Sequence, residues 1–179
     1  MRLFAAVNIP KELKEAFGEV QAGFRGHGKF SVVNPENIHI TLKFLGEVPE
    51  NNLGHLREAL DKINFEPFKV KLSGVGAFPN HKFVKVVWAG VSDGNEEIQK
   101  LHQHVEQAIS EFGFKKDKNF ESHATLARAK FINNRNGMRD FFEKYENSEF
   151  GKFKVNSFEL MESRLSPKGA EYSVVKSFS

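Results

Sequence analysis

The chain has 179 residues, of which 40% are hydrophobic and 27% are charged, so it fits one globular domain with a core large enough to fold unaided. It contains no cysteine, which excludes disulfides, thiolate catalysis and cysteine-ligated zinc. Its net charge of +3 suits a phosphate-bearing partner but is small for a protein that coats nucleic acid without regard to sequence.

No stretch of the sequence predicts membrane insertion. The apolar runs are far shorter than a membrane span, and the first of them, Leu3 to Ile9, is too short for a signal peptide and is interrupted by Asn8. We therefore expect a cytoplasmic protein with no membrane partner.

The spacing of apolar residues predicts five elements in the first half of the chain. In order they are a buried strand from Leu3 to Ile9, a helix from Lys11 to about Phe24, a strand from Ile38 to Leu45, a helix from about Glu50 to Ile63 and a strand from Phe68 towards Phe78. Gly23, Gly26 and Gly28, at and after the end of the first helix, predict a loop before the second strand.

The second half predicts the same order of elements. They are a strand from Phe83 to Val91, a helix from Asp93 or Asn95 to about Phe112, a strand from about Glu121 to Phe131, a helix from about Asn136 to Tyr145 and a strand from about Phe153 to Met161. A turn at 166–169 and a last strand, Tyr172 to Phe178, follow. The turn at Pro79-Asn80 predicts antiparallel pairing of the strands on either side of it.

Both halves thus read strand, helix, strand, helix, strand, and the final strand has no counterpart. We predict a single α+β domain over residues 1–179 with an approximate repeat of 1–81 and 82–179. In this prediction two pseudo-symmetric lobes each form an antiparallel sheet with helices on its outer face, and the active-site cleft lies between them.

One short motif occurs twice, on the second strand of each half. The sequence His39-Ile40-Thr41-Leu42 returns as His123-Ala124-Thr125-Leu126, and the chain contains no threonine outside these two copies. In a strand, residues i and i+2 face the same side, so the histidine and threonine of each copy point one way while the apolar residues point into the core.

Two histidines that approach one reacting centre from opposite sides suit general acid and base catalysis, because imidazole titrates near neutral pH. Phosphoryl transfer fits best, since in-line displacement places nucleophile and leaving oxygen on opposite sides of phosphorus. Thr41 and Thr125 would hydrogen-bond the equatorial oxygens. A histidine in a motif that occurred once would most simply lie at the edge of the core with its hydrogen bonds satisfied. Because the motif occurs twice, we favour the catalytic interpretation. A metal site is the rival, but His39 and His123 without a carboxylate at matching spacing leave a coordination shell incomplete, so we expect no metal and no cofactor.

The duplicated motif resembles the two-histidine phosphoesterase superfamily, in particular the RNA 2′,3′-cyclic phosphodiesterase or 2′-5′ RNA ligase-like family. The resemblance extends over nearly the whole chain. It includes the blocks RLFAAVNIP, NPENIHITLKFLGEV, GVGAFPN with KVVWAGV, HATLAR and LMESRLSPKGAEYSVV. One departure is Val32, where the family has an aromatic residue, usually tryptophan. If that aromatic holds a base, another side chain would have to do so here.

The resemblance implies a hydrolase that needs no metal, opens a 2′,3′-cyclic phosphate at an RNA end and leaves a 2′-phosphate. It makes His39 the proton donor to the departing 3′ oxygen and His123 the proton acceptor that activates water. Three alternatives stay open: a 2′-5′ ligase of tRNA halves, a phosphodiesterase for small cyclic nucleotides or 2′-5′ oligonucleotides, and a non-catalytic protein that binds RNA ends. We expect RNA, with tRNA as one candidate, as the partner of a monomer.

Basic residues near the motifs are candidate phosphate ligands. Lys43 shares the His39 face by strand alternation, so we expect it in the cleft. Arg128 follows the second motif as in the family pattern HxTLxR, but an unbroken strand would turn it to the opposite face. It therefore binds substrate only if a bulge intervenes, and otherwise lies at the rim or serves the fold.

Other candidates have simpler explanations. Phe78 and Phe83 flank a turn and are expected in the core, with base stacking as the alternative. The loop with Lys115, Lys116 and Lys118 is either solvated or binds RNA backbone. The remaining histidines are expected to be solvated: His27, His55, His81, His102 and His104.

Overall fold

The computed structural model describes residues 1–167 and 169–179, so the predicted turn at 166–169 includes Lys168, which lies outside the described residues. Within the described part, nine strands form one antiparallel sheet of order β7-β4-β5-β6-β3-β1-β8-β9, and β2 pairs with β6 beside this path. No helix of the described part is both long and apolar enough to cross a membrane.

The strands are β1 (Arg2–Asn8), β2 (Gly28–Val32), β3 (His39–Glu47), β4 (Phe68–Asn80), β5 (Phe83–Asp93), β6 (His123–Ile132), β7 (Glu149–Val155), β8 (Phe158–Ser166) and β9 (Gly169–Phe178). The α-helices are α1 (Lys11–Gly23), α2 (Leu53–Asp61), α3 (Asn95–Ala108) and α4 (Arg135–Tyr145). Short 3₁₀ helices are η1 (Pro35–Asn37), η2 (Glu50–Asn52) and η3 (Ser110–Phe112).

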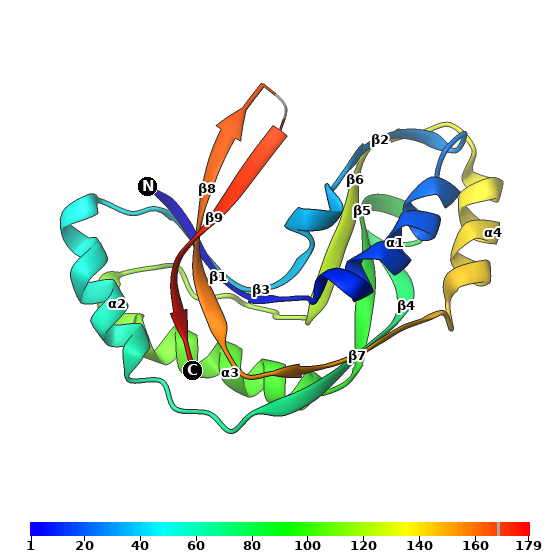
Figure 1. Cartoon of the computed structure of the whole chain (residues 1–179). Coiled ribbons are helices and arrows are strands. Elements are labelled where there is room, and N and C mark those ends of the chain that lie inside the picture. Colours follow the sequence, from blue (N-terminus) through cyan, green and yellow to red (C-terminus); the bar gives the residue numbers. More distant parts are fainter. Residues whose placement is uncertain (168) are drawn as a thin grey trace.

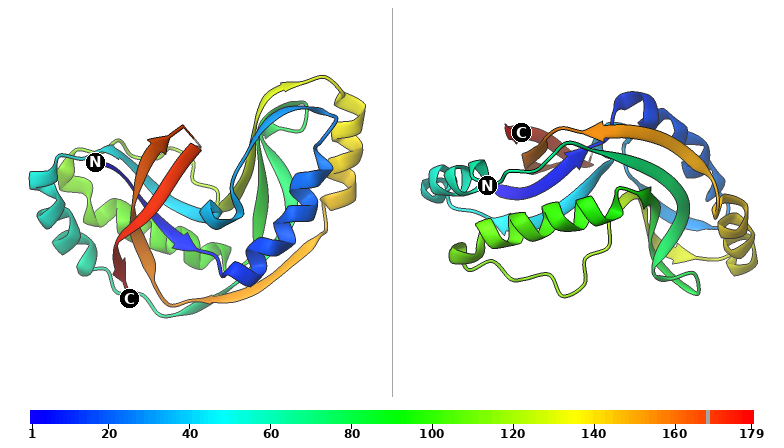
Figure 2. Two further views of the ribbon diagram at one scale, coloured as in Figure 1. Left: turned by 45° about the horizontal axis from the view of Figure 1, so that its top comes forward. Right: turned by 90° about the horizontal axis from the view of Figure 1, so that it is seen from below.

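The sheet curls into two lobes that meet at β3 and β6 (Figures 1 and 2). The first lobe holds β1, β3, β8 and β9, and α2 and α3 pack against it. The second lobe holds β2, β4, β5, β6 and β7, with α1 and α4 packed against it. The helices lie on the outside of the curl, which leaves the inner faces of both lobes free to line a site (Figure 2).

Each lobe combines strands from both halves of the chain. β4 comes from the first half but pairs with β5 and β7, whereas β8 and β9 come from the second half and complete the first lobe beside β1. Because the halves exchange strands in this way, neither lobe is a continuous stretch of sequence.

Two elements differ from the sequence prediction. β2 was expected to be part of a loop, because its residues are mostly exposed and show little apolar alternation, but it pairs with β6. The single strand predicted from Phe153 to Met161 is two strands. The strand is interrupted at 156–157, where the chain crosses from the second lobe to the first. There the hydroxyl of Ser157 donates to the carboxylate of Glu159.

The core lies directly behind the repeated motif. Ile40, Leu42, Ala124 and Leu126 are each at most 1% exposed, and they join one apolar cluster with residues of the sheet and of all four α-helices. Fully burying a side chain such as Leu42 contributes roughly 1.5–3 kcal/mol. The residues between the motif histidines and threonines therefore fix both strands firmly at this point.

Candidate active site

The two motifs lie side by side at the junction of the lobes. The described pairing between β3 and β6 is a single antiparallel residue pair, Ile40 with Ala124, and these are the central residues of the two motifs. This register aligns His39 with Thr125 and Thr41 with His123. All four polar side chains then project from the face opposite Ile40 and Ala124, related by a local two-fold axis through that pair.

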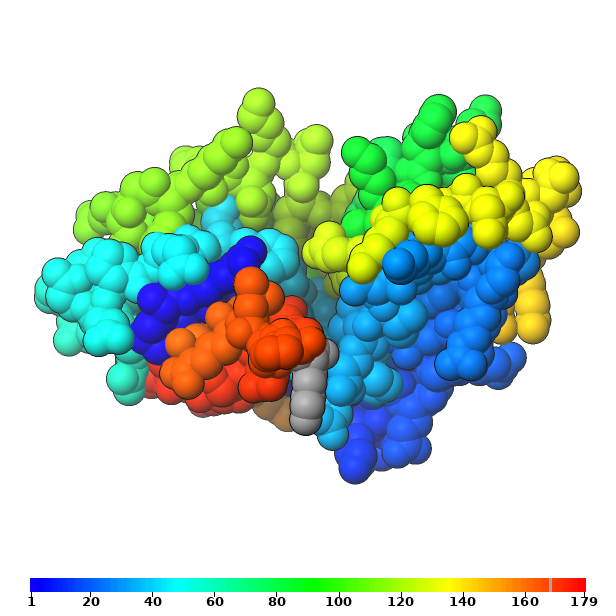
Figure 3. All heavy atoms as spheres, turned by 90° about the horizontal axis from the view of Figure 1, so that it is seen from above, coloured from blue at the N-terminus to red at the C-terminus, as the bar shows by residue number. Residues whose placement is uncertain are grey.

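The polar face opens into two adjoining cavities that form one cleft. The larger, of about 510 Å³, is lined by His39, and the smaller, of about 240 Å³, by His123. Thr41, Thr125 and Arg128 line both cavities, so the two histidines reach a shared space from opposite ends. Figure 3 shows the molecule from above, with the two lobes on either side of a central depression.

Both imidazole rings are oriented by the same backbone contact. Nδ1 of His39 lies 2.7 Å from the carbonyl oxygen of Asn37, and Nδ1 of His123 lies 2.7 Å from that of Glu121. A carbonyl oxygen can only accept, so each Nδ1 carries the hydrogen and each Nε2 is left for chemistry. Nε2 of His39 lies 2.9 Å from the hydroxyl oxygen of Thr41, which donates to it while the ring is neutral.

Burial keeps both imidazoles neutral in the free protein. It lowers the pKa of His39 to about 4, against the hydrogen bond to Asn37, and the charges of Lys14 and His123 add to the shift. Burial also lowers the pKa of His123 below its usual value, against the Glu121 contacts, and the Arg128 guanidinium adds to it. A site that disfavours protonated imidazole in this way is prepared for an anion, whose charge would offset these effects.

A β-bulge in each motif decides which later side chain enters the cleft. In β3 the register moves from Thr41 opposite Ala6 to Lys43 opposite Ala5, so Leu42 is an extra residue. In β6 it moves from Thr125 opposite Trp88 to Ala127 opposite Val87, so Leu126 is extra. Each bulge buries two consecutive residues and reverses the alternation beyond the motif.

The bulge in β3 turns Lys43 away from the exposed position that strand alternation predicted, although Lys43 still contributes to the lining of the smaller cavity. Lys43 is 2% exposed, and its ammonium group contacts the carboxylates of Glu106 and Asp117 and donates to the carbonyl oxygen of Lys115 at 2.6 Å. Phe44 takes the cleft position instead and is 66% exposed.

The bulge in β6 gives Arg128 the opposite outcome. Its side chain is exposed and lines both cavities of the cleft, at the position that Phe44 occupies on the first strand. The two motifs therefore differ in their neighbours: a cation, Arg128, lies beside the second motif, and an aromatic ring, Phe44, lies beside the first.

Two aromatic residues around His39, Phe4 and Tyr172, were not predicted from the sequence. The Phe4 ring stacks on His39 with centroids 4.9 Å apart, and Tyr172 meets His39 edge-on at 5.5 Å. Phe78 meets His123 edge-on at 4.8 Å and lines the cleft, so its expected place in the core was wrong. For Phe4 and Tyr172, no local pattern separates such residues from ordinary strand aromatics.

Phe83 and His102 also differ from their expected environments. Phe83 is 63% exposed instead of buried. His102 is 7% exposed instead of solvated: its ring stacks on Phe120 at 4.0 Å, and Nδ1 lies 2.8 Å from the carbonyl oxygen of Leu42. His102, Glu106 and Asp117 are close enough together to hold a metal ion, but the Lys43 ammonium already contacts both carboxylates. The Lys43 ammonium thus offsets one of the two carboxylate charges and already lies against both groups.

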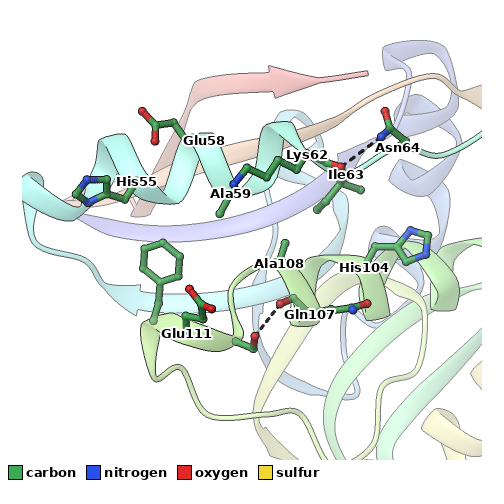
Figure 4. Close-up of a pocket in the computed structure, with 12 residues that line it drawn as sticks. His55, Glu58, Ala59, Lys62, Ile63, Asn64, His104, Gln107, Ala108 and Glu111 are labelled. Atoms are coloured by element: carbon green, nitrogen blue, oxygen red, sulfur yellow. Dashed lines mark hydrogen bonds between the residues drawn. The ribbon is translucent and has the colours of Figure 1, made fainter.

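A larger cavity, of about 760 Å³, lies elsewhere, between α2 and α3 with η3 (Figure 4). It holds two histidines, but His55 and His104 stand at opposite ends of it. None of the motif residues lines it, so its size does not make it the catalytic site.

Comparisons with known proteins agree with this geometry. Residues 4–179 match the family model of the AKAP7 2′5′ RNA ligase-like domain. A protein from Methanocaldococcus jannaschii named RNA 2′,3′-cyclic phosphodiesterase is 38% identical over 176 residues, which cover 98% of this chain and 99% of that protein. One of the same name from Archaeoglobus fulgidus is 39% identical over 178 residues, with 99% of each covered.

Solved structures give the same fold. The crystal structure of TT0787 of Thermus thermophilus matches with a TM-score of 0.82 and 33% identity, covering 100% of this chain and 97% of that one. Escherichia coli LigT complexed with 3′-AMP matches with a TM-score of 0.80 and 22% identity, covering 99% and 96%, which supports the fold alone.

Paired His-x-Thr motifs on the central strands of a curled α+β sheet define a two-histidine phosphoesterase. Within that superfamily, the chain belongs to the 2′-5′ RNA ligase-like family, as the sequence resemblance predicted.

Proposed function

We propose that this protein opens the 2′,3′-cyclic phosphate at an RNA end and leaves a 2′-phosphate. The observation that carries the proposal is the pairing of Ile40 with Ala124, which presents His39, Thr41, His123 and Thr125 on one face. The names of the relatives from M. jannaschii and A. fulgidus support the same substrate class.

In this mechanism the cyclic phosphate lies between the two histidines. Nε2 of His123 removes a proton from water, and the water oxygen forms a bond to phosphorus. The bond from phosphorus to the 3′ oxygen breaks, and protonated Nε2 of His39 gives that oxygen its proton. Thr41, Thr125 and Arg128 hold the non-bridging oxygens as their charge increases, because hydrogen bonds to an anion are stronger than neutral ones.

The low pKa of His39 makes its protonation depend on the substrate. Free His39 has a pKa of about 4 and is neutral at pH 7, whereas a phosphodiester anion beside the ring favours its charged form. Binding of a phosphate monoester or diester should therefore take up protons from solution near neutral pH. His123 remains neutral in the same complex because burial, to which the charge of Arg128 adds, keeps its pKa below the usual value.

The reaction in this form needs no metal ion, because His123 activates the water and Arg128 supplies the fixed positive charge. The test is to incubate the protein with EDTA and an RNA that ends in a 2′,3′-cyclic phosphate, and then to map the product. The mechanism gives a 2′-phosphate at an undiminished rate. A 3′-phosphate, or activity only on addition of a metal, would contradict it.

A further inference from the structure

A second groove lies at the end of the second lobe, outside the catalytic cleft. It has a volume of about 640 Å³ and is enclosed by the tip of the β4–β5 hairpin, the end of β6 and the start of α4. We call it the hairpin groove. In Figure 3 the green hairpin and the yellow segment that ends β6 and begins α4 lie together at one end of the molecule.

The hairpin groove concentrates positive charge. Lys82, Lys85, Arg135 and Arg139 line it together with no carboxylate, although the whole chain has a net charge of only +3. Arg139 is paired with acidic neighbours on α4. In the described part of the chain the other three cations have no ion-pair partner within 4.0 Å, so their charge is free to meet an anion.

An exposed aromatic ring stands among these cations. Phe83 is 63% exposed at the hairpin tip, and the half-buried Val84 and Ile132 provide apolar surface around it. Cations that track a phosphate backbone, combined with an aromatic ring on which a base can stack, are how proteins bind single-stranded nucleic acid without base-specific contacts.

The hairpin groove and the catalytic cleft are lined by nearby residues of the same two strands. On β5, Val86 lines the cleft and the preceding residue, Lys85, lines the groove. On β6, Arg128 lines the cleft and Ile132 lines the groove, four residues or about 13 Å further along the strand. An RNA strand that leaves the cleft beside Arg128 therefore has only about 13 Å to cover before it reaches the groove, whose own lining contains no carboxylate.

We propose that the hairpin groove binds the upstream, single-stranded part of the same RNA whose 3′ end occupies the cleft. The inference rests on the proposed function and adds to it a class of substrate, namely RNA strands longer than a nucleotide. Lys82, Lys85 and Arg135 contact successive phosphates, and Phe83 stacks on a base. Recognition of this kind depends on length and salt and not on base sequence.

The test compares two substrates that share the reacting group. One is a 2′,3′-cyclic mononucleotide, which fits the cleft alone, and the other is an oligoadenylate of about ten nucleotides with the same cyclic end. Reversal of charge in Lys85→Glu/Arg135→Glu should raise KM for the oligonucleotide about tenfold or more and reduce its salt dependence by about two ions. The mononucleotide kcat/KM should change less than about twofold. Phe83→Ala should raise the oligonucleotide KM in the same selective way.

A matched control reverses two exposed lysines elsewhere, on α3 and β7, as Lys100→Glu/Lys152→Glu. It alters net charge equally and should leave both substrates unaffected. Equal loss on both substrates, or equal loss in the control, would overturn the hairpin groove as an RNA site.

Binding measured without turnover separates this inference from the proposed function. Fluorescence anisotropy of a labelled oligoadenylate that ends in a 2′-phosphate should show weaker binding by Lys85→Glu/Arg135→Glu than by the parent and the control. If the parent protein hydrolysed neither cyclic substrate, the proposed function would be wrong. The anisotropy measurement would still show whether the hairpin groove binds RNA. Unchanged anisotropy in Lys85→Glu/Arg135→Glu would refute the groove even in a fully active enzyme.

Discussion

The ammonium nitrogen of Lys43 lies 3.2 Å from a carboxylate oxygen of Asp117, so the first motif strand is tied to the loop that leads into the second motif. Lys43 also pairs with Glu106 on α3 and donates to the backbone of Lys115 in that loop. Burial would raise the pKa of Glu106, but hydrogen bonds from Lys43 and from the Asp117 amide hold it below its usual value. A lysine expected to hold substrate thus holds the loop before His123.

Replacing this lysine should reduce stability and activity together. Lys43→Met leaves the carboxylate of Glu106 partly buried without its cation, which should lower the free energy of unfolding by about 3 kcal/mol. It should also lower kcat well below the unfolding temperature, because the loop before His123 loses its anchor. Urea denaturation and steady-state kinetics measure the two effects. Lys43→Met/Glu106→Gln should recover part of the stability, and a double variant no better than the single would count against the ion pair.

Arg128 is predicted to contact the phosphate. Arg128→Met should lower kcat/KM by about a hundredfold, since it removes a preformed charge from the place where negative charge develops. Lys130→Met, two residues further along β6 and outside the two cleft cavities, is the matched control and should retain parental kinetics. Equal effects of the two substitutions would show a general loss of positive charge and not a specific contact.

The outcome for Lys43 and Arg128 shows where strand alternation stops being predictive. The repeated motif predicted the paired site, because the two histidines, the two threonines and the buried residues behind them follow one local periodicity. The bulges at Leu42 and Leu126 depend on how neighbouring strands pair, which no local pattern encodes. They exchanged the expected positions of Lys43 and Phe44, and they brought Arg128 into the cleft.

The strand exchange between halves was beyond prediction for the same reason. The order of elements was readable from apolar spacing, and the turn at Pro79-Asn80 correctly predicted that β4 pairs with β5. The pairing of β4 with β7, and of β8 with β1, depends on contacts distant in sequence. The sequence of β2 shows no apolar periodicity, because most of its residues are exposed and the strand pairs with one neighbour only, β6.

The pH dependence of hydrolysis should follow the lowered imidazole pKa values. The profile of kcat/KM reports the free protein, in which one ring must be protonated and the other neutral. Because the pKa of His39 is about 4 and that of His123 is also lowered, the kcat/KM optimum should lie below about pH 6.5. The kcat profile should extend to higher pH, because bound phosphate stabilises protonated His39. Identical kcat and kcat/KM profiles, or a kcat/KM optimum above pH 7, would contradict this assignment.

The activity should depend on the hydroxyl group of Thr41 more than on the shape of its side chain. Thr41→Val keeps the volume but removes the donor that lies 2.9 Å from Nε2 of His39, so kcat should fall by about tenfold to a hundredfold. Thr41→Ser keeps the hydroxyl and should retain most of the activity. Thermal denaturation of both variants checks the fold, and similar kinetics for valine and serine would exclude a role for the hydroxyl.

The most direct test of the paired site is single-turnover hydrolysis of a 2′,3′-cyclic RNA by His39→Gln, His123→Gln and the double variant. Each single substitution should slow hydrolysis by about a hundredfold to ten-thousandfold while RNA binding persists, because each removes one proton transfer from the same step. The double variant should be little slower than the worse single variant, as expected for residues that act as a unit. A single variant that hydrolysed the RNA at nearly the parental rate would show that the two histidines do not act as a pair.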